Sequence, residues 1–123
     1  MTVAAIDFQM LANAGFPPKR FAPGDVVFEE GDKGDAMYIV RSGELTIEKH
    51  GKVMETVGPA GVFGEMALID GSARGATVRA KTDCEVTPIN EKTFLFLVHE
   101  TPFFAIAVMR TLATRLRRMN ELV

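Results

Sequence analysis

The chain has 123 residues, of which 47% are hydrophobic and 24% are charged, and its formal net charge at pH 7 is −2. This length and composition are typical of one folded globular domain and unlike those of a disordered chain. The small negative charge excludes a general attraction for nucleic acid or for an acidic membrane, so we expect any anionic ligand to be bound locally. The single cysteine, Cys84, excludes an internal disulfide and a cysteine-based zinc cluster.

The first fifteen residues lack a basic region of the signal-peptide type, and Asp7 interrupts their apolar run. No uninterrupted apolar span reaches the roughly 18 residues that a membrane-spanning helix requires. We therefore expect a cytoplasmic protein with no membrane contact and no direct contact to nucleic acid. A single domain over residues 1–123 is expected.

Residues 1–19 form the first of three segments in this domain. The spacing of Ile6, Met10 and Leu11 allows a short helix, which Gly15 and the prolines after it would end.

Residues 20–89 have a different pattern, in which short apolar runs alternate with period two. Examples are Met37 with Ile39 and Leu45 with Ile47, and the runs are separated by Gly-, Pro- and Asp-containing turns. Many short antiparallel strands with such turns are typical of a β-sandwich, a β-roll or a jelly roll. The sequence thus predicts a mainly β domain with flanking helices, of the α+β class.

Residues 90–123 return to a helical period. Asn90 can cap a helix that begins after it, and Pro102 follows Thr101 as a proline in a first helical turn. The final helix, of about 20 residues, has one apolar stripe; the stripe comprises Met109, Leu112, Leu116, Met119 and Val123. The same helix carries a basic face, which we interpret as solvated because such faces contact nucleic acid less often than water; the face comprises Arg115, Arg117 and Arg118.

Residues 63–80, FGEMALIDGSARGATVRA, place one carboxylate and one guanidinium in a small and apolar segment. We expect a strand, a helical turn that begins after Gly64, and a loop, because the first turn of a helix offers free N–H groups to an anion. Arg74 can present a planar fork of donors to phosphate oxygens. Glu65 only accepts hydrogen bonds, so beside an anion it suits a neutral donor such as a sugar hydroxyl. The two side chains together indicate a phosphorylated ribose.

This segment resembles the phosphate-binding cassette of cyclic nucleotide-binding domains. The preceding FAPGDVVFEEGDKGDAMYIVRSGELTI resembles the first strands of that family, and AKTDCEVTPINEKTFLFLVHETP resembles its last strands and hinge helix. The resemblance extends from Arg20 to the end of the chain. It implies an antiparallel β-roll with a short helix in the cassette and with hinge and lid helices at the C-terminus.

The resemblance also implies roles for individual residues. Glu65 would accept from the ribose 2′-hydroxyl, Arg74 would pair with the exocyclic phosphate oxygens, and backbone amides of Gly64, Ala67 and Gly75 would complete the cradle. The expected cyclic nucleotide-binding residues are Gly64, Glu65, Met66, Ala67, Arg74, Gly75 and Ala76. Val78, Met119 and Asn120 are expected to contact the base or to form a lid over it.

Two positions depart from the family pattern. Ala73 stands where members usually have proline, which softens the loop without removing a contact. Gly75 stands where members selective for cGMP often have threonine, so no hydroxyl is available to guanine. This favours cAMP as the ligand and leaves cGMP open.

Three functions stay open at this point, of which a cyclic nucleotide sensor without enzymatic activity ranks first. An interaction or dimerisation domain that has lost its ligand ranks second, with a homodimer or an effector bound through the C-terminal helix. A phosphodiesterase or a cupin-like metalloenzyme ranks third, because no serine has a base partner evident in the sequence. We expect no metal site and no cofactor, since His50 and His99 lack the spacing of metal ligands.

Overall fold

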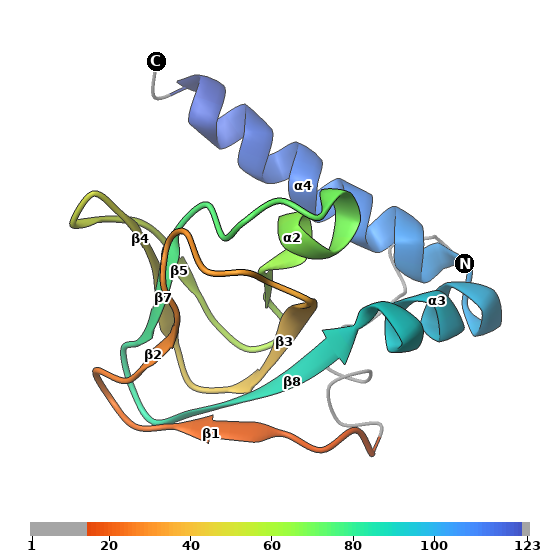
Figure 1. Cartoon of the computed structure of the whole chain (residues 1–123), viewed down its shortest axis with the longest axis horizontal. Coiled ribbons are helices and arrows are strands. Elements are labelled where there is room, and N and C mark those ends of the chain that lie inside the picture. Colours follow the sequence, from red (N-terminus) through yellow and green to blue (C-terminus); the bar gives the residue numbers. More distant parts are fainter. Residues whose placement is uncertain (1–14, 122–123) are drawn as a thin grey trace.

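The computed structural model of the chain describes residues 15–121 (Figure 1). The short helix expected within residues 1–19, and Val123 of the C-terminal stripe, lie outside these described residues.

In the part of the chain that the structure describes, two four-stranded antiparallel sheets form the body of the domain. Their strand orders are β1-β8-β3-β6 and β2-β7-β4-β5, so neighbouring strands are often far apart in sequence. The predicted antiparallel β-roll is thereby confirmed, and Figure 1 shows the sheets facing each other below the helices. The strands are β1 (Lys19–Phe21), β2 (Val26–Phe28), β3 (Ala36–Ser42), β4 (Leu45–Lys49), β5 (Lys52–Val57), β6 (Val62–Phe63), β7 (Thr77–Ala80) and β8 (Cys84–Asn90).

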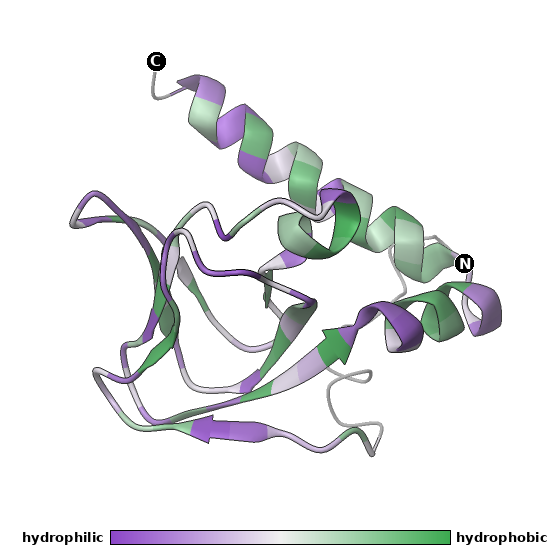
Figure 2. Cartoon of the chain, viewed as in Figure 1, coloured by the Kyte–Doolittle hydropathy of each residue, from purple (hydrophilic) through white to green (hydrophobic). Residues whose placement is uncertain are grey.

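Strand β3 lies at the centre of the packing and is buried on both faces. Tyr38 and Val40 belong to the core between the sheets, whereas Met37 and Ile39 pack against the helices. Figure 2 shows hydrophobic segments on β8 and on the first half of α4. A strand that separates two apolar layers needs hydrophobic residues at both parities, which explains why its sequence is a continuous apolar run. Cys84 is buried in the core between the sheets, and this burial raises the pKa of its thiol.

Three helices of the described residues accompany the sheets: α2 (Glu65–Asp70), α3 (Glu91–Glu100) and α4 (Phe103–Glu121). The predicted cap of α3 is confirmed, because the Asn90 side chain accepts a hydrogen bond from the Thr93 amide. Helix α4 begins directly after Pro102 and runs across the roll above α2 (Figure 1). Within residues 15–121 no single helix is long and apolar enough to cross a membrane; α3 and α4 meet that test only when counted together across a 117° bend.

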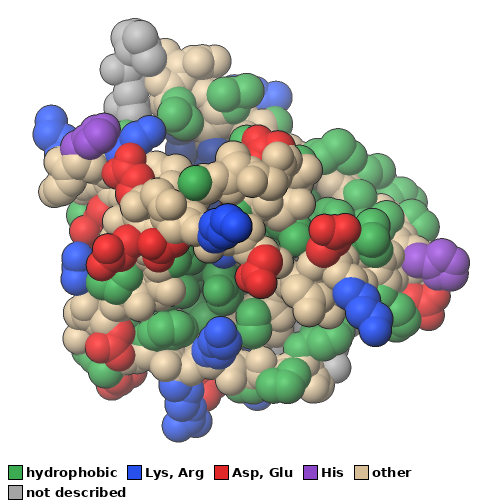
Figure 3. All heavy atoms as spheres, viewed as in Figure 1, with side chains coloured by type: hydrophobic (Ala, Val, Ile, Leu, Met, Phe, Trp, Pro, Cys, Tyr) green, Lys and Arg blue, Asp and Glu red, His purple; other side chains and the backbone are tan. Residues whose placement is uncertain are grey.

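Helix α4 has two apolar faces. Phe104 and Val108 are buried against the roll. Met109, Leu116 and Met119, from the predicted stripe, are exposed instead, and so are Leu95, Phe96 and Phe103 near the α3–α4 junction. Figure 3 shows hydrophobic side chains gathered on the side of the molecule where α3 and the start of α4 lie.

Candidate functional site

The cassette begins where β6 ends, at Gly64. Its φ angle is +77°, a left-handed conformation that favours glycine. A Cβ atom here would lie 2.9 Å from Nη1 of Arg74 and 3.3 Å from the Phe28 ring. Gly64 is therefore needed both for the turn into α2 and for the close approach of the guanidinium.

Arg74 is buried, with 5% of its surface exposed. Its Nη1 and Nη2 atoms donate to the carbonyl oxygens of Gly64 and Ala36, both at 2.7 Å, and its guanidinium carbon lies 4.0 Å from the centre of the Phe28 ring. Within the described residues Arg74 forms no ion pair, and its buried Nε has no hydrogen-bond partner. Burial lowers the pKa of this guanidinium. A buried cation with an unused donor is suited to an anion from outside the chain.

The β2–β3 loop fixes the backbone around Arg74. The Arg74 amide donates to the Asp32 carbonyl at 2.8 Å, and the Gly31 amide donates to the Arg74 carbonyl at 2.8 Å. A Cβ at Gly34 would lie 2.4 Å from Arg74 Nε, so this loop also packs directly on the side chain. The sequence indicated only turns in this Gly- and Asp-containing loop, and it did not predict Phe28, Gly34 and Ala36 as neighbours of the guanidinium.

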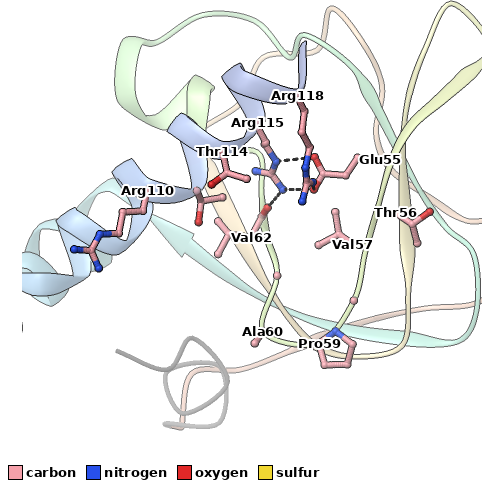
Figure 4. Close-up of a pocket in the computed structure, with 13 residues that line it drawn as sticks. Glu55, Thr56, Val57, Pro59, Ala60, Val62, Arg110, Thr114, Arg115 and Arg118 are labelled. Atoms are coloured by element: carbon pink, nitrogen blue, oxygen red, sulfur yellow. Dashed lines mark hydrogen bonds and ion pairs between the residues drawn. The ribbon is translucent and has the colours of Figure 1, made fainter. Parts of the chain in front are cut away.

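Glu65, the first residue of α2, is also buried, with 4% of its surface exposed. Its Oε1 accepts a hydrogen bond from Nη1 of Arg115 on α4 at 2.5 Å. Arg115 further donates from Nε and Nη2 to the two carboxylate oxygens of Glu55 on β5, at 3.0 and 3.2 Å, and from Nη2 to the Val62 carbonyl (Figure 4). Burial alone would lower the pKa of Arg115, but the bonds and charges of Glu55 and Glu65 raise it.

The solvated basic face predicted for α4 is therefore wrong at Arg115. Its side chain is 17% exposed and connects three elements, whereas Arg117 is exposed and Arg118 is 61% exposed with Nη1 3.8 Å from Glu55. The reason is helical position, because Arg115 lies eleven residues after Phe104 on the face that packs against the roll. The sequence reading also missed Glu55.

The remaining predicted residues are those of the cassette and those expected to contact the base or to form a lid. Ala67 is buried within α2, Met66 and Gly75 are exposed, and Ala76 is half-buried. Val78 is buried in the core between the sheets, while Met119 is 56% exposed and Asn120 is exposed. The structure thus brings Gly64, Glu65, Ala67 and Arg74 together, but leaves Met119 and Asn120 on the outside of α4.

A separate cavity of about 400 Å³ lies between α4 and the turn that joins β5 to β6 (Figure 4). Its lining includes Glu55, Arg115 and Arg118 but neither Glu65 nor Arg74. Arg115 consequently stands between this cavity and the cassette. Within residues 15–121 no group of three or more His, Cys, Asp and Glu side chains is placed to hold a metal ion.

Both a family profile and a curated relative show similarity to cyclic nucleotide-binding proteins. A sequence profile described as the cyclic nucleotide-binding domain matches residues 18–101. The cyclic AMP receptor protein of Thermus thermophilus is 31% identical over 115 residues, which cover 89% of this chain and 53% of that protein. The chain thus spans about half the length of this curated relative.

Two solved structures extend the comparison. One is the second cyclic nucleotide-binding domain of a cAMP-dependent kinase regulatory subunit bound to Sp-2Cl-cAMPS; it is 30% identical, the match covers 87% of this chain and 71% of that chain, and the TM-score is 0.75. The other belongs to a cyclic-GMP-dependent signalling pathway that regulates bacterial phytopathogenesis; it is 26% identical, the match covers 95% of both chains, and the TM-score is 0.77.

Proposed function

Because the chain belongs to the cyclic nucleotide-binding domain family, we propose that it is a cyclic nucleotide sensor that binds the cyclic phosphate at Arg74 and the ribose at Glu65. The observation that carries the proposal is the buried guanidinium of Arg74, which has no carboxylate partner among the described residues and an unused Nε donor. A buried cation without a counter-charge destabilises a folded protein, and a bound phosphate would supply that counter-charge.

The phosphate end of the site supports this assignment. Two of the five N–H donors of Arg74 bind main-chain carbonyls, and they hold the guanidinium over the Phe28 ring. The other donors are available for exocyclic phosphate oxygens. Because the side chain is already positioned, little conformational entropy is lost when the anion binds.

The ribose end supports it as well. Arg115 occupies Oε1 of Glu65, while Oε2 accepts no hydrogen bond from the described residues. A 2′-hydroxyl can donate to Oε2 without displacing the arginine. The same carboxylate would then bind the ligand on one oxygen and α4 on the other, which connects the nucleotide to the helix that we propose carries the signal.

We propose cAMP as the preferred ligand, with cGMP as a weaker one. Gly75 is exposed and offers no side chain to the base or the phosphate, so no hydroxyl is available there to favour guanine. The relative from Thermus thermophilus is a cyclic AMP receptor, and one structural neighbour belongs to a cyclic-GMP-dependent pathway. The preference therefore rests on the cassette of this chain and is modest.

The apolar stripe of α4 supports homodimer formation. Met109, Leu112, Leu116 and Met119 recur with alternating spacings of three and four residues, which is the pattern of a two-helix seam. Met109, Leu116 and Met119 are exposed, whereas Leu112 is partly buried against the roll. A Leu116→Glu variant should shift the protein from dimer to monomer in sedimentation velocity, whereas Arg117→Glu on the same helix should not.

Titration calorimetry with cAMP, cGMP and 5′-AMP tests the proposed function. We expect saturable binding of both cyclic nucleotides, tighter for cAMP, and no binding of 5′-AMP at the same concentrations. Absence of heat with either cyclic nucleotide, together with a stable dimer, would instead support the interaction domain. Conversion of cAMP to AMP during incubation with divalent metal ions would support the enzyme.

A further inference from the structure

Glu55 lies outside the cassette but is connected to Glu65 through Arg115. Its strand, β5, pairs with β4, and the pairs Leu45–Val57 and Ile47–Glu55 follow one register. Cross-strand partners face the same side of a sheet, and Ile47 and Val57 both pack in the core between the sheets. Glu55 therefore occupies an inward position where an apolar residue would be expected.

A β-bulge lies directly beside this residue. The register shifts between Ile47–Glu55 and Glu48–Val53, which leaves Met54 as an extra residue on β5. Bulges re-aim side chains and are frequent next to functional sites. The local backbone thus directs a carboxylate toward α4, where Arg115 receives it (Figure 4).

The way in which Glu55 binds Arg115 determines what is left for Glu65. Glu55 takes the Nε and Nη2 atoms of the guanidinium, and the Val62 carbonyl also accepts from Nη2. Only Nη1 then remains for Glu65, and it contacts Oε1 alone. Arginine otherwise tends to pair with a carboxylate through two parallel hydrogen bonds, which would occupy both oxygens of Glu65.

We propose that Glu55 is a positioning residue for ribose recognition: by holding one edge of Arg115, it keeps Oε2 of Glu65 available to the 2′-hydroxyl of a cyclic nucleotide. This inference rests on the proposed function. Without Glu55, Arg115 turns its fork toward Glu65 and competes with the hydroxyl. Loss of Glu55 therefore weakens a ligand only if that ligand has a 2′-hydroxyl.

The pair cAMP and 2′-deoxy-cAMP separates this role from a merely structural one. In the parent protein we expect cAMP to bind about 10- to 100-fold more tightly than 2′-deoxy-cAMP, because the hydroxyl donates to a carboxylate. In Glu55→Gln the affinity for cAMP should fall about five- to tenfold, and that for 2′-deoxy-cAMP should stay within about twofold. Glu55→Ala provides a second variant in case the first folds poorly, and circular dichroism checks both.

Two further variants complete the experiment. Glu48→Gln on the neighbouring strand β4 removes a carboxylate paired with Arg79 and should leave the ratio of the two affinities unchanged. In an Arg115→Met background no guanidinium competes for Glu65, so adding Glu55→Gln should leave the ratio as it is in Arg115→Met alone.

The outcomes separate this inference from the proposed function. If the parent discriminates between the two ligands but Glu55→Gln weakens both equally, or weakens neither, the positioning role is wrong and the proposed function stands. If the parent binds neither ligand, the proposed function itself fails, and the positioning role fails with it.

Discussion

Arg74 and Arg115 are both buried arginines beside the cassette, yet their charges are balanced in opposite ways. Arg115 contacts two carboxylates, those of Glu55 and Glu65. Arg74 contacts two main-chain carbonyls and an aromatic face, with no ion pair among residues 15–121. The chain thus neutralises Arg115 itself, whereas Arg74 has no carboxylate partner among these residues.

The pKa directions follow the same division. Burial lowers the pKa of Arg74, and the more distant charges of Asp32, Asp35 and Glu65 do not offset it. Burial acts on Arg115 as well, but direct hydrogen bonds from two carboxylates reverse the direction. A buried arginine that the protein does not neutralise is hence the better indicator of an anion site, since structural arginines usually have their own carboxylates.

Removing Arg74 should have the largest effect on binding. Truncation of one partner of a buried charge pair costs about 2–5 kcal/mol, so Arg74→Ala should weaken cAMP binding roughly 30- to 4,000-fold. Arg79→Ala, which removes a partly exposed arginine on β7 outside the cassette's Arg74 contacts, is the matched control and should bind normally. Titration calorimetry measures both, and binding by Arg74→Ala within threefold of the parent would show that this guanidinium does not hold the phosphate.

Removing the Glu65 carboxylate at the ribose end of the site should have a smaller effect on cAMP affinity. Glu65→Ala loses a hydrogen bond between a hydroxyl and a carboxylate, which is worth about 1.5–3 kcal/mol, or roughly 10- to 150-fold in affinity for cAMP. It also deprives Arg115 of one partner, so amide hydrogen exchange in α4 should become faster in the absence of ligand. Unchanged exchange over residues 110–121 would show that Glu65 does not hold this helix.

A side chain added at Gly34, beside the Arg74 guanidinium, tests whether the position of this guanidinium matters for binding. A Cβ at Gly34 would lie 2.5 Å from the guanidinium carbon of Arg74 and 2.8 Å from Cβ of Ala67, so Gly34→Ala must displace the side chain. We expect cAMP affinity to fall on the order of tenfold. Gly58→Ala meets no atom within 4 Å and is the control. Equal affinities in the two variants would mean that the observed position of Arg74 is not required.

The parts of this site that the sequence predicted are those with local signals. Asn90 caps a helix through the next turn, and Gly64 lies at a sharp change from strand to helix, so neighbouring residues suffice to identify both. Glu65 and Arg74 lie within one segment whose order resembles a known motif. Each of these inferences needs only residues that are close in sequence.

The parts that the sequence did not predict depend on how distant elements pack. Arg115 meets Glu65 across fifty residues and Glu55 across sixty. A signal existed, because Phe104, Val108 and Arg115 share one helix face and Glu55 shares a strand face with Val57. If both faces are interpreted as inward, the helix face carries the Arg115 guanidinium and the strand face carries the Glu55 carboxylate. Only the packed roll shows that these two charges meet.

The smallest expected effect concerns nucleotide choice at the edge of the phosphate end. A Cβ added at Gly75 meets no atom within 4 Å, and the residue has no left-handed φ, so a side chain fits there without strain. Gly75→Thr adds a hydroxyl that can hydrogen-bond guanine, and one such bond contributes about 0.5–1.5 kcal/mol. The ratio of the cAMP affinity to the cGMP affinity should therefore fall by roughly 2- to 12-fold, which narrows or reverses the preference for cAMP.

Gly75→Val is the matched control for that change, because valine has the same branched shape as threonine but no hydroxyl. Competition binding with both nucleotides gives the affinity ratio for each variant. A shift in threonine alone assigns the effect to the hydroxyl. The same shift in both variants would assign the effect to the stiffer loop. An unchanged affinity ratio in Gly75→Thr would show that position 75 takes no part in choosing the base. That choice would then be made by residues other than Gly75, Arg74 and Arg115.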